Sequence, residues 1–240
     1  MNVIVTGGSS GLGKAIVEQT SSKADSVLFT YRTHEDLAKK MESEYSNTRA
    51  LFCDFENEEC IESFIETIRE NSPDVLVNNA YGGYTIGDYF YRTPIEDFEQ
   101  AFRINVIPLI RITQATIKEF RKKRSGKIIT ILSSAIVGTP PMGYSVYAAT
   151  KAYIGQLVKL WSKEYIQYGI TSNAVSPDFM QTKLTEDTDD LIKERILEQS
   201  PLKTYLTVSE VADVVVKLVD SPKYVNGVNI PVNAGSNIIF

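Results

Sequence analysis

Short apolar runs alternate with segments of helical periodicity along this chain, and that alternation restricts its fold more than any other feature. The first half carries apolar runs at Val3 to Thr6, Val27 to Tyr31, Ala50 to Cys53 and Val75 to Val77, with helical patterns beginning near Gly11, Glu35 and Glu58. Strands that are apolar almost throughout are typical of a parallel sheet covered by helices on both faces. The pattern therefore predicts an α/β fold.

The second half continues the alternation. Helices are expected from about Phe98 to Lys123 and Val146 to Gln167, strands at Lys127 to Leu132 and Thr171 to Val175, then helices near Thr182 to Gln199 and Ser209 to Val219 and a last strand at Val228 to Val232. Ser209 is the expected N-cap of its helix, with Glu210 in the first turn. No linker or repeat is visible, so we expect residues 1–240 to form one domain, a Rossmann-type doubly wound parallel sheet of about seven strands with helices on both faces.

Composition argues against several classes of function. The formal net charge is -5 and the pI is near 5.1, without the basic stripe typical of nucleic acid binding. No signal leader and no apolar run of membrane-spanning length is visible, so we expect a soluble, cytoplasmic protein with no membrane partner. Two cysteines and one histidine support neither a disulfide framework nor a metal site.

A glycine-rich loop follows the first expected strand and opens the first helix. Gly7, Gly11 and Gly13 are spaced Gly-x-x-x-Gly-x-Gly, which is not the more common Gly-x-Gly-x-x-Gly pattern. Glycines at this place let the backbone approach a pyrophosphate at the helix N-terminus. The loop indicates dinucleotide binding, and the alternative is that the glycines serve only a sharp turn.

The end of the second strand bears on which dinucleotide is bound. An acidic residue there would accept hydrogen bonds from the ribose hydroxyls of NAD and repel a 2′-phosphate. This chain has Tyr31, Arg32 and Thr33 instead, and an arginine can form charge-assisted hydrogen bonds with a phosphate. We therefore expect NADP(H), although Arg32 could equally be a solvated surface residue.

A tyrosine and a lysine stand four residues apart in an expected helix. Residues at this spacing share one face, so Tyr147 and Lys151 can point into one cleft. The adjacent serines Ser133 and Ser134 end the preceding strand and can supply a hydroxyl opposite the tyrosine. This arrangement indicates proton transfer at an alcohol or a carbonyl.

Taken in order, these residues resemble the short-chain dehydrogenase/reductase family. The resemblance covers essentially the whole chain and is carried by Thr6-Gly7-x-x-x-Gly11-x-Gly13, Asn78-Asn79-Ala80, Asn105, Ser134, Tyr147-x-x-x-Lys151, Pro177-x-x-x-x-Thr182 and the ending Asn226-Gly227-x-x-Ile230-x-Val232-Asn233-x-Gly235. It implies reduction of a ketone by hydride from a nicotinamide.

The resemblance also implies a role for each catalytic residue. Tyr147 would protonate the carbonyl oxygen, and Lys151 would hold the nicotinamide ribose and lower the pKa of the phenol. Ser134 would donate a hydrogen bond to the same oxygen, and we prefer it to Ser133 because its offset from Tyr147 matches the family. Asn105 would position a water that links Lys151 to solvent, or would only bond locally.

Cofactor contacts are carried over in the same way. They fall on the glycine loop, the ends of the second and third strands, the segment after the fourth and the segment after the sixth: Gly7, Ser9, Ser10, Gly11, Leu12, Gly13, Tyr31, Arg32, Thr33, Asp54, Phe55, Asn79, Ala80, Tyr81, Tyr147, Lys151, Pro177, Met180 and Thr182. Two positions depart from the family, since Tyr81 and Asp178 replace glycines that are usual there.

Within the family the chain most resembles the 3-oxoacyl-acyl-carrier-protein reductases, through its lack of an acid near Arg32, its carboxyl-terminal motif and the run from Arg121 to Thr130. A basic helix end could dock an acidic carrier protein, and Arg124 is the residue we would choose for that contact. A solvated charge run explains the same residues equally well, and a second basic residue is missing where Tyr168 stands. The resemblance further implies a homotetramer.

Aromatic residues are dense between Tyr81 and Tyr91, where Tyr84, Tyr89 and Phe90 also lie. With Met142, Tyr144 and Phe179 they could line an acyl pocket suited to an unsaturated or aryl-bearing 3-oxoacyl thioester. Core packing or an oligomer contact is the alternative. Two competing functions also stay open, namely a dehydrogenase of a free small alcohol, sugar or steroid, and a catalytically silent NADP-binding scaffold.

Overall fold

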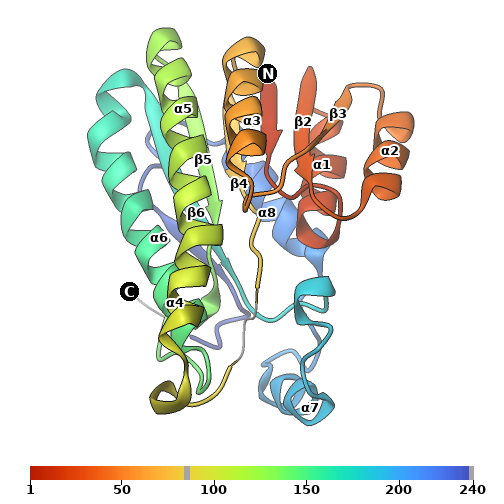
Figure 1. Cartoon of the computed structure of the whole chain (residues 1–240), viewed down its shortest axis with the longest axis vertical. Coiled ribbons are helices and arrows are strands. Elements are labelled where there is room, and N and C mark those ends of the chain that lie inside the picture. The colour runs from red at the N-terminus through yellow and green to blue at the C-terminus, as the bar shows by residue number, and fades with distance from the viewer. Residues whose placement is uncertain (84–86, 238–240) are drawn as a thin grey trace.

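A computed structural model describes residues 1–83 and 87–237 and confirms the expected α/β fold (Figure 1). One parallel sheet of seven strands runs through the molecule in the order β3-β2-β1-β4-β5-β6-β7. The strands are β1 (Asn2–Val5), β2 (Ser26–Tyr31), β3 (Thr48–Phe52), β4 (Val75–Asn78), β5 (Gly126–Ile131), β6 (Ile170–Pro177) and β7 (Asn229–Val232). This is the doubly wound order of a Rossmann-type sheet.

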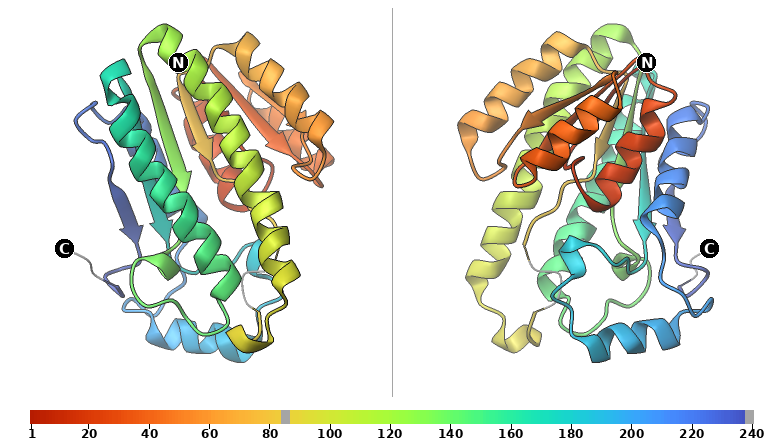
Figure 2. Two further views of the ribbon diagram at one scale, coloured as in Figure 1. Left: turned by 60° about the vertical axis from the view of Figure 1, so that its left-hand side comes forward. Right: turned by 90° about the vertical axis from the view of Figure 1, so that its right-hand side faces the viewer.

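Helices cover both faces of the sheet, as the two views of Figure 2 show. The helices are α1 (Gly11–Ser21), α2 (Glu35–Glu44), α3 (Glu58–Asn71), α4 (Ile95–Ala101), α5 (Ile107–Lys123), α6 (Ser145–Tyr165), α7 (Asp190–Gln199) and α8 (Val208–Asp220). One face carries α1, α2 and α8, and the other carries α3, α5 and α6. None of the described helices is both long and apolar enough to cross a membrane.

The two helical layers explain why the strands have no polar face. In β1, Val3 and Val5 pack toward α1 and α8, whereas Ile4 between them packs toward α3 and α5. Successive side chains of a strand point to opposite sides, so a strand covered twice must be apolar at every position. The apolar runs of the sequence are continuous because the strands are buried on both faces.

The strand order reverses direction beside β1, which pairs with β2 on one side and β4 on the other. Chain segments leaving β1 and β4 therefore turn to opposite faces, and a crevice opens between them at the carboxyl edge of the sheet. The glycine loop after β1 and the segments after β4, β5 and β6 all meet at this edge. In Figure 1 helix α7 lies beyond the same edge.

Two expected helices differ from the structure. The long helix begins at Ile95 and contains a π-helical segment, Phe102–Val106, between α4 and α5. The single helix expected over Thr182 to Gln199 is wrong, because a short 3₁₀ turn, Lys183–Thr185, precedes α7 and the two are separate. The Asp189 carboxylate accepts from the backbone N–H of Leu191 and begins α7 there, so a local cap interrupts the helix.

Ser209 is not the N-cap of α8, as the sequence had suggested. The cap is Thr207, whose hydroxyl accepts from Glu210 N while the Glu210 carboxylate accepts from Thr207 N at 2.9 Å. This reciprocal pair is a capping box. Ser209 lies inside the first turn and accepts from the Gln19 amide.

Thr207→Ala is expected to lower the free energy of unfolding by about 1 kcal/mol, because it leaves a helix N–H without its side-chain acceptor. Ser209→Ala is the matched control and is expected to cost clearly less, since it loses only an exposed contact. Urea unfolding of both variants measures the difference. Equal losses would contradict the assignment of the cap.

Candidate active site

The glycine loop is held tightly between β2 and β4. The backbone N–H of Gly7 donates to the Thr30 hydroxyl at 2.9 Å, and the Asn79 amide donates to the carbonyl oxygens of Thr6 and Gly7 at 2.9 and 3.0 Å. Gly7 and Gly11 have positive φ angles of 67° and 52°, which favour glycine. A Cβ on Gly13 would collide with the Gly7 carbonyl.

This loop fits the pyrophosphate of a dinucleotide. Ser10 occupies the N-cap position of α1 but makes no side-chain cap hydrogen bond. The first-turn N–H groups of α1 therefore keep their capacity to bind an anion, and the helix dipole favours negative charge there. Thr182 lies against Gly11 across the crevice, so the two expected cofactor contacts are brought together.

The residue that follows β2 is a cation, Arg32, at the carboxyl edge of the sheet. Arg32 lies 3.5 Å from the Glu56 carboxylate, with both side chains about half exposed. Exposed ion pairs of this kind are weak, so Arg32 can exchange Glu56 for a phosphate at small cost. Glu35 is engaged with Lys39 on α2 and is not the acid at the strand end.

Tyr147 and Lys151 lie on one buried face of α6, as their spacing predicts. The Lys151 ammonium is buried, donates to the Ile131 carbonyl oxygen at 2.9 Å and lies 5.9 Å from the centroid of the Tyr147 ring. The end of β5 thus meets the first turns of α6. Acid and ammonium converge at the carboxyl edge of the sheet.

The two neighbouring serines have different partners, and the preference for Ser134 is not supported by the geometry. Ser133 is the serine whose side chain lies close enough to Tyr147 to lower its pKa, and its hydroxyl oxygen accepts from Ala135 N. The Ser134 hydroxyl donates instead to the Asp178 carboxylate at 3.1 Å. The Ser134 hydroxyl is thus engaged with Asp178, and the choice between the two serines remains a prediction.

Burial controls the protonation of the catalytic pair. Removal from water lowers the pKa of Lys151 from its ordinary 10.5 to about 7, since no opposite charge in the described chain compensates. Burial also raises the pKa of Tyr147, and the Ser133 hydrogen bond partly opposes that rise. In the protein without cofactor the phenol pKa is therefore raised by burial, and its lowering by Lys151 remains a prediction.

Asn105 lies in the π-helical segment and faces the crevice. Its side-chain oxygen accepts from Gly82 N at 2.8 Å, and its amide donates to Gly82 O at 3.0 Å. Asn105 thus holds the segment after β4 directly. A π-helical insertion often occurs at functional positions, since it turns one side chain out of register.

Tyr81, which stands where the family usually has glycine, covers the catalytic pair. Its ring centroid lies 4.5 Å from the Lys151 nitrogen and 5.1 Å from the Tyr147 ring centroid, in an edge-to-face arrangement. Burial, together with Tyr147, raises the pKa of the Tyr81 phenol, and the Thr150 hydroxyl opposes that rise. Sequence reasoning placed Tyr81 near the cofactor but missed this contact.

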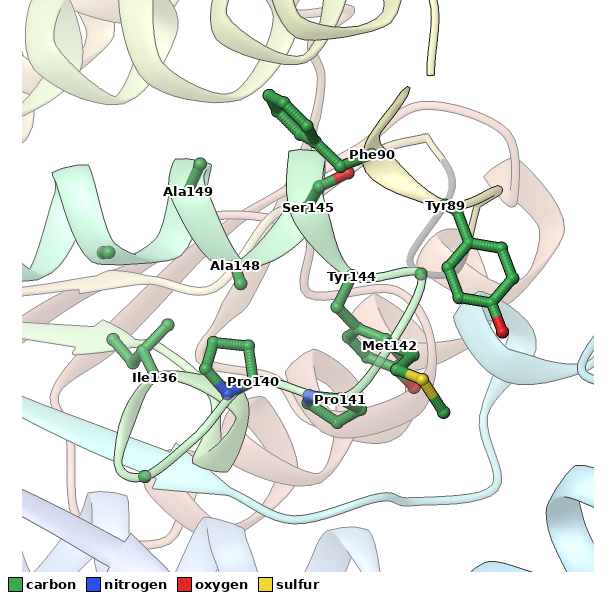
Figure 3. A pocket seen from close by; sticks show the side chains of 13 residues that line it. Tyr89, Phe90, Ile136, Pro140, Pro141, Met142, Tyr144, Ser145, Ala148 and Ala149 are labelled. Atoms are coloured by element: carbon green, nitrogen blue, oxygen red, sulfur yellow. The ribbon is translucent and has the colours of Figure 1, made fainter. Parts of the chain in front are cut away.

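An apolar cavity of about 530 Å³ opens on the face of α6 that carries Ser145, Ala148 and Ala149 (Figure 3). Met142 and Tyr144 line it from the loop before α6, and Tyr89 and Phe90 line it from the segment before α4. The Tyr144 ring also packs edge-on against Tyr147, with centroids 5.9 Å apart. Neither Tyr147 nor Lys151 lines the cavity, and the Tyr144 ring is the contact between its lining and Tyr147.

Not every expected pocket residue lies in this cavity. Phe179 packs on Tyr205 at 5.8 Å and lines a separate small cavity beside α7, and Tyr81 faces Lys151 instead. Tyr91 is largely exposed, and Tyr84 lies outside the described residues. The aromatic residues expected in one pocket thus lie in several different environments.

Asp178, the other departure from the family, joins three chain segments. Its carboxylate accepts from the Ser134 hydroxyl after β5, from the Ser236 hydroxyl near the carboxyl terminus and from Phe179 N, at 3.1, 3.1 and 2.9 Å. Met180, an expected cofactor contact, packs with the hydrophobic core below α8. Sequence reasoning noticed the substitution at Asp178 but did not assign these bonds.

The basic run at the end of α5 lies at the opposite edge of the sheet. Arg124 directly precedes β5, so the length of that strand separates it from Tyr147 of the same chain. Arg121 and Arg124 lie over the Tyr168 ring, at 4.6 and 5.9 Å from its centroid. A partner bound at Arg124 would not reach this chain's own catalytic pair directly.

A glycine loop and a buried Tyr/Lys pair thus meet at the carboxyl edge of a Rossmann-type sheet, as in a nucleotide-dependent oxidoreductase. A family model described as Enoyl-(Acyl carrier protein) reductase matches residues 7–237. The 3-oxoacyl-(acyl-carrier-protein) reductase FabG of Aquifex aeolicus is 32% identical over 241 residues, covering 97% of this chain and 95% of the relative. FabG of Escherichia coli is 33% identical over 242 residues, covering 98% and 97%.

A solved structure titled short chain dehydrogenase/reductase family protein superposes with a TM-score of 0.87 at 26% identity, covering 100% of this chain and 98% of that one. The chain belongs to the short-chain dehydrogenase/reductase family of oxidoreductases, and its curated relatives include the FabG reductases.

Burial of Lys151 predicts a pH dependence of stability in the protein without cofactor. Between pH 7 and 10.5 the unfolded chain binds more protons at this lysine than the folded one, so its contribution to stability rises with pH in that window. We expect the urea midpoint to rise from pH 7 to pH 9 in the native chain relative to Lys151→Met. Parallel profiles for the two proteins would contradict the assignment.

Proposed function

We propose that this protein is an NADPH-dependent reductase of 3-oxoacyl thioesters carried on acyl carrier protein. The observation that supports it most is the burial of Tyr147 and Lys151 together, near Ser133, at the carboxyl edge of the sheet. The names of the curated relatives favour a carrier-bound 3-oxoacyl group.

Bound NADPH would supply hydride to the carbonyl carbon of the substrate. Tyr147 donates its proton to the carbonyl oxygen as the alcohol forms, and Ser133 stabilises the charge that develops on that oxygen. Positioned general acids contribute about 10²- to 10⁴-fold in rate, and a preplaced hydrogen-bond donor adds about 10²- to 10³-fold. A raised pKa keeps Tyr147 protonated at neutral pH and so suits it to the acid role.

Lys151 would hold the nicotinamide ribose with the N–H groups that Ile131 leaves available. Its ammonium also favours charge on the phenol oxygen once the proton has left Tyr147. The pKa near 7 means that Lys151 loses its charge as pH rises through neutrality in the protein without cofactor. Phosphates of the cofactor would oppose that loss.

The adenosine side favours NADPH over NADH. Arg32 is the cation at the end of β2, and its only described ionic partner is the exposed Glu56. A 2′-phosphate would gain a charge-assisted hydrogen bond there. Tyr31 and Thr33 flank the same position, and Asp54 and Phe55 follow β3 beside it.

The apolar cavity is the proposed acyl site, and flat conjugated chains are the substrates that its aromatic lining fits best. The Tyr144 ring lines this cavity and also packs against the Tyr147 ring. Carrier-protein docking at Arg124 requires an assembly in which one subunit presents Arg124 near another subunit's crevice. Exposed apolar side chains on the outer surfaces of α5 and α6, among them Ile107, Tyr153 and Leu160, support a homotetramer.

The deciding experiment measures NADPH consumption with 3-oxoacyl carrier protein, an enoyl carrier protein, conjugated and saturated acyl chains, and free ketones. We expect turnover of the carrier-bound 3-oxoacyl group, with the conjugated chain preferred, and a loss of at least about 10²-fold in Tyr147→Phe. Turnover of free ketones alone would favour a dehydrogenase of small alcohols. Tight NADPH binding without any turnover would favour a silent scaffold.

The two serines provide a second test. Ser133→Ala is expected to lower kcat by about 10²- to 10³-fold, because it removes a donor to the developing oxyanion. Ser134→Ala is the matched control and is expected to lose less than about tenfold, since its hydroxyl serves Asp178. The reverse order would show that Ser134 is the donor.

Arg32→Asp is expected to shift the ratio of kcat/KM for NADPH over NADH toward NADH by about 10- to 100-fold. The variant both removes a charge-assisted bond and repels the 2′-phosphate. Arg49→Asp, which changes an exposed arginine on β3, controls for net charge. An unchanged ratio in Arg32→Asp would exclude Arg32 from cofactor selection.

A further inference from the structure

The ring of Tyr81 lies against the buried Lys151 ammonium. Its centroid is 4.5 Å from the Lys151 nitrogen, within the range of a cation–π contact, and its plane meets the Tyr147 ring at 81° with centroids 5.1 Å apart. One aromatic side chain therefore contacts both groups of the catalytic pair. A glycine at this position could do neither.

The backbone that carries this ring is fixed from another helix. Gly82 follows Tyr81 directly, and both its N–H and its carbonyl are bonded to the Asn105 side chain at 2.8 and 3.0 Å. Asn105 is buried in the π-helical segment between α4 and α5. The Asn105 side-chain amide therefore acts on Tyr81 indirectly, because it holds the backbone segment that carries the Tyr81 ring.

The ring, and not the hydroxyl, is the part that the site uses. The Tyr81 hydroxyl is buried, and within residues 1–83 and 87–237 it has no hydrogen-bond partner of ordinary geometry. The Lys151 ammonium has lost its water and keeps the Ile131 carbonyl as its one hydrogen-bond acceptor in the described chain. A π face next to a desolvated cation replaces part of the lost hydration.

We propose that Tyr81 is a positioning residue of the reaction centre, whose ring holds the Lys151 ammonium in its charged form beside the Tyr147 phenol, and that Asn105 fixes the ring through Gly82. The role extends the proposed function but does not depend on which carbonyl compound is reduced.

The groups around Lys151 allow a change in its pKa to be attributed to the Tyr81 ring. Tyr81 from the segment after β4 and Tyr147 from α6 are the titratable groups that face it. Asp178 and Tyr144 lie one contact further away from Lys151. Burial, Tyr147 and Asp178 together raise the pKa of Tyr144 to about 12, whereas Asp178 does not affect the pKa of Lys151. Removing the π face should therefore lower the pKa of Lys151 below its value of about 7.

The test is an NMR titration of protein labelled with ¹³C at the lysine ε carbon, with the Lys151 signal assigned by its loss in Lys151→Arg. Tyr81→Phe keeps the ring, so we expect its midpoint to stay within about 0.3 pH units of the native one. Tyr81→Leu removes the π face, and its midpoint should fall by about one pH unit. Tyr224→Leu, which changes a fully exposed tyrosine, is the matched control.

A Tyr81→Leu midpoint that stays at the native value would overturn the proposal and leave Tyr81 as packing. A midpoint that falls in Tyr81→Phe as far as in Tyr81→Leu would also overturn it, because the hydroxyl would then be the active part. Circular dichroism checks that each variant folds. If Tyr81→Leu does not fold, Asn105→Ala carries the test, since releasing Gly82 should lower the Lys151 midpoint in the same direction and an unchanged midpoint refutes it.

Activity gives a separate readout. If Lys151 must be charged, the alkaline limb of the kcat profile should move to lower pH in Tyr81→Leu by the same amount as the NMR midpoint. A moved NMR midpoint with no turnover of any substrate would leave the role of Tyr81 standing and count against the proposed reaction. A shift of the alkaline limb of the kcat profile without a shift of the Lys151 NMR midpoint would refute the proposed role of Tyr81.

Discussion

A buried ammonium that meets no opposite charge within residues 1–83 and 87–237 is the constraint on which the candidate site depends. Lys151 stays next to Tyr147 because α6 begins at the end of β5, where the Ile131 carbonyl accepts one of its protons. Desolvation works against its charge and brings the pKa to about 7. The groups that surround it, a backbone carbonyl, a phenol and an aromatic ring, are those that can favour a cation without neutralising it.

The rest of the fold delivers these groups to one edge. Because β1 lies between β2 and β4, the chain leaves neighbouring strands toward opposite faces, and Asn79 keeps the resulting crevice closed at its base through the carbonyls of Thr6 and Gly7. The glycine loop then lies on one side of the crevice and the catalytic pair on the other. Double burial of the strands makes the edge rigid enough to hold both.

Much of this could be predicted from the chain itself, and the failures have physical causes. The strands were recognisable since each is apolar at every position, and the Tyr147 and Lys151 pair since helical spacing alone puts them on one face. Ser134 was preferred to Ser133 because its spacing from Tyr147 in the sequence matches the family, whereas a contact with Tyr147 depends on how the loop between β5 and α6 folds. The helix over Thr182 to Gln199 was overextended because the Asp189 cap competes locally with helix continuation.

The sequence by itself determined the sheet, its parallel order and the spacing of the acid and ammonium, since these follow from periodicity and short-range geometry. Only the tertiary structure decided which serine meets Tyr147, that Asp178 ties three segments together and that Tyr81 covers Lys151. Those contacts join residues from different strands and loops. Their geometry exists only after the crossovers have packed both faces of the sheet, so no local pattern encodes it.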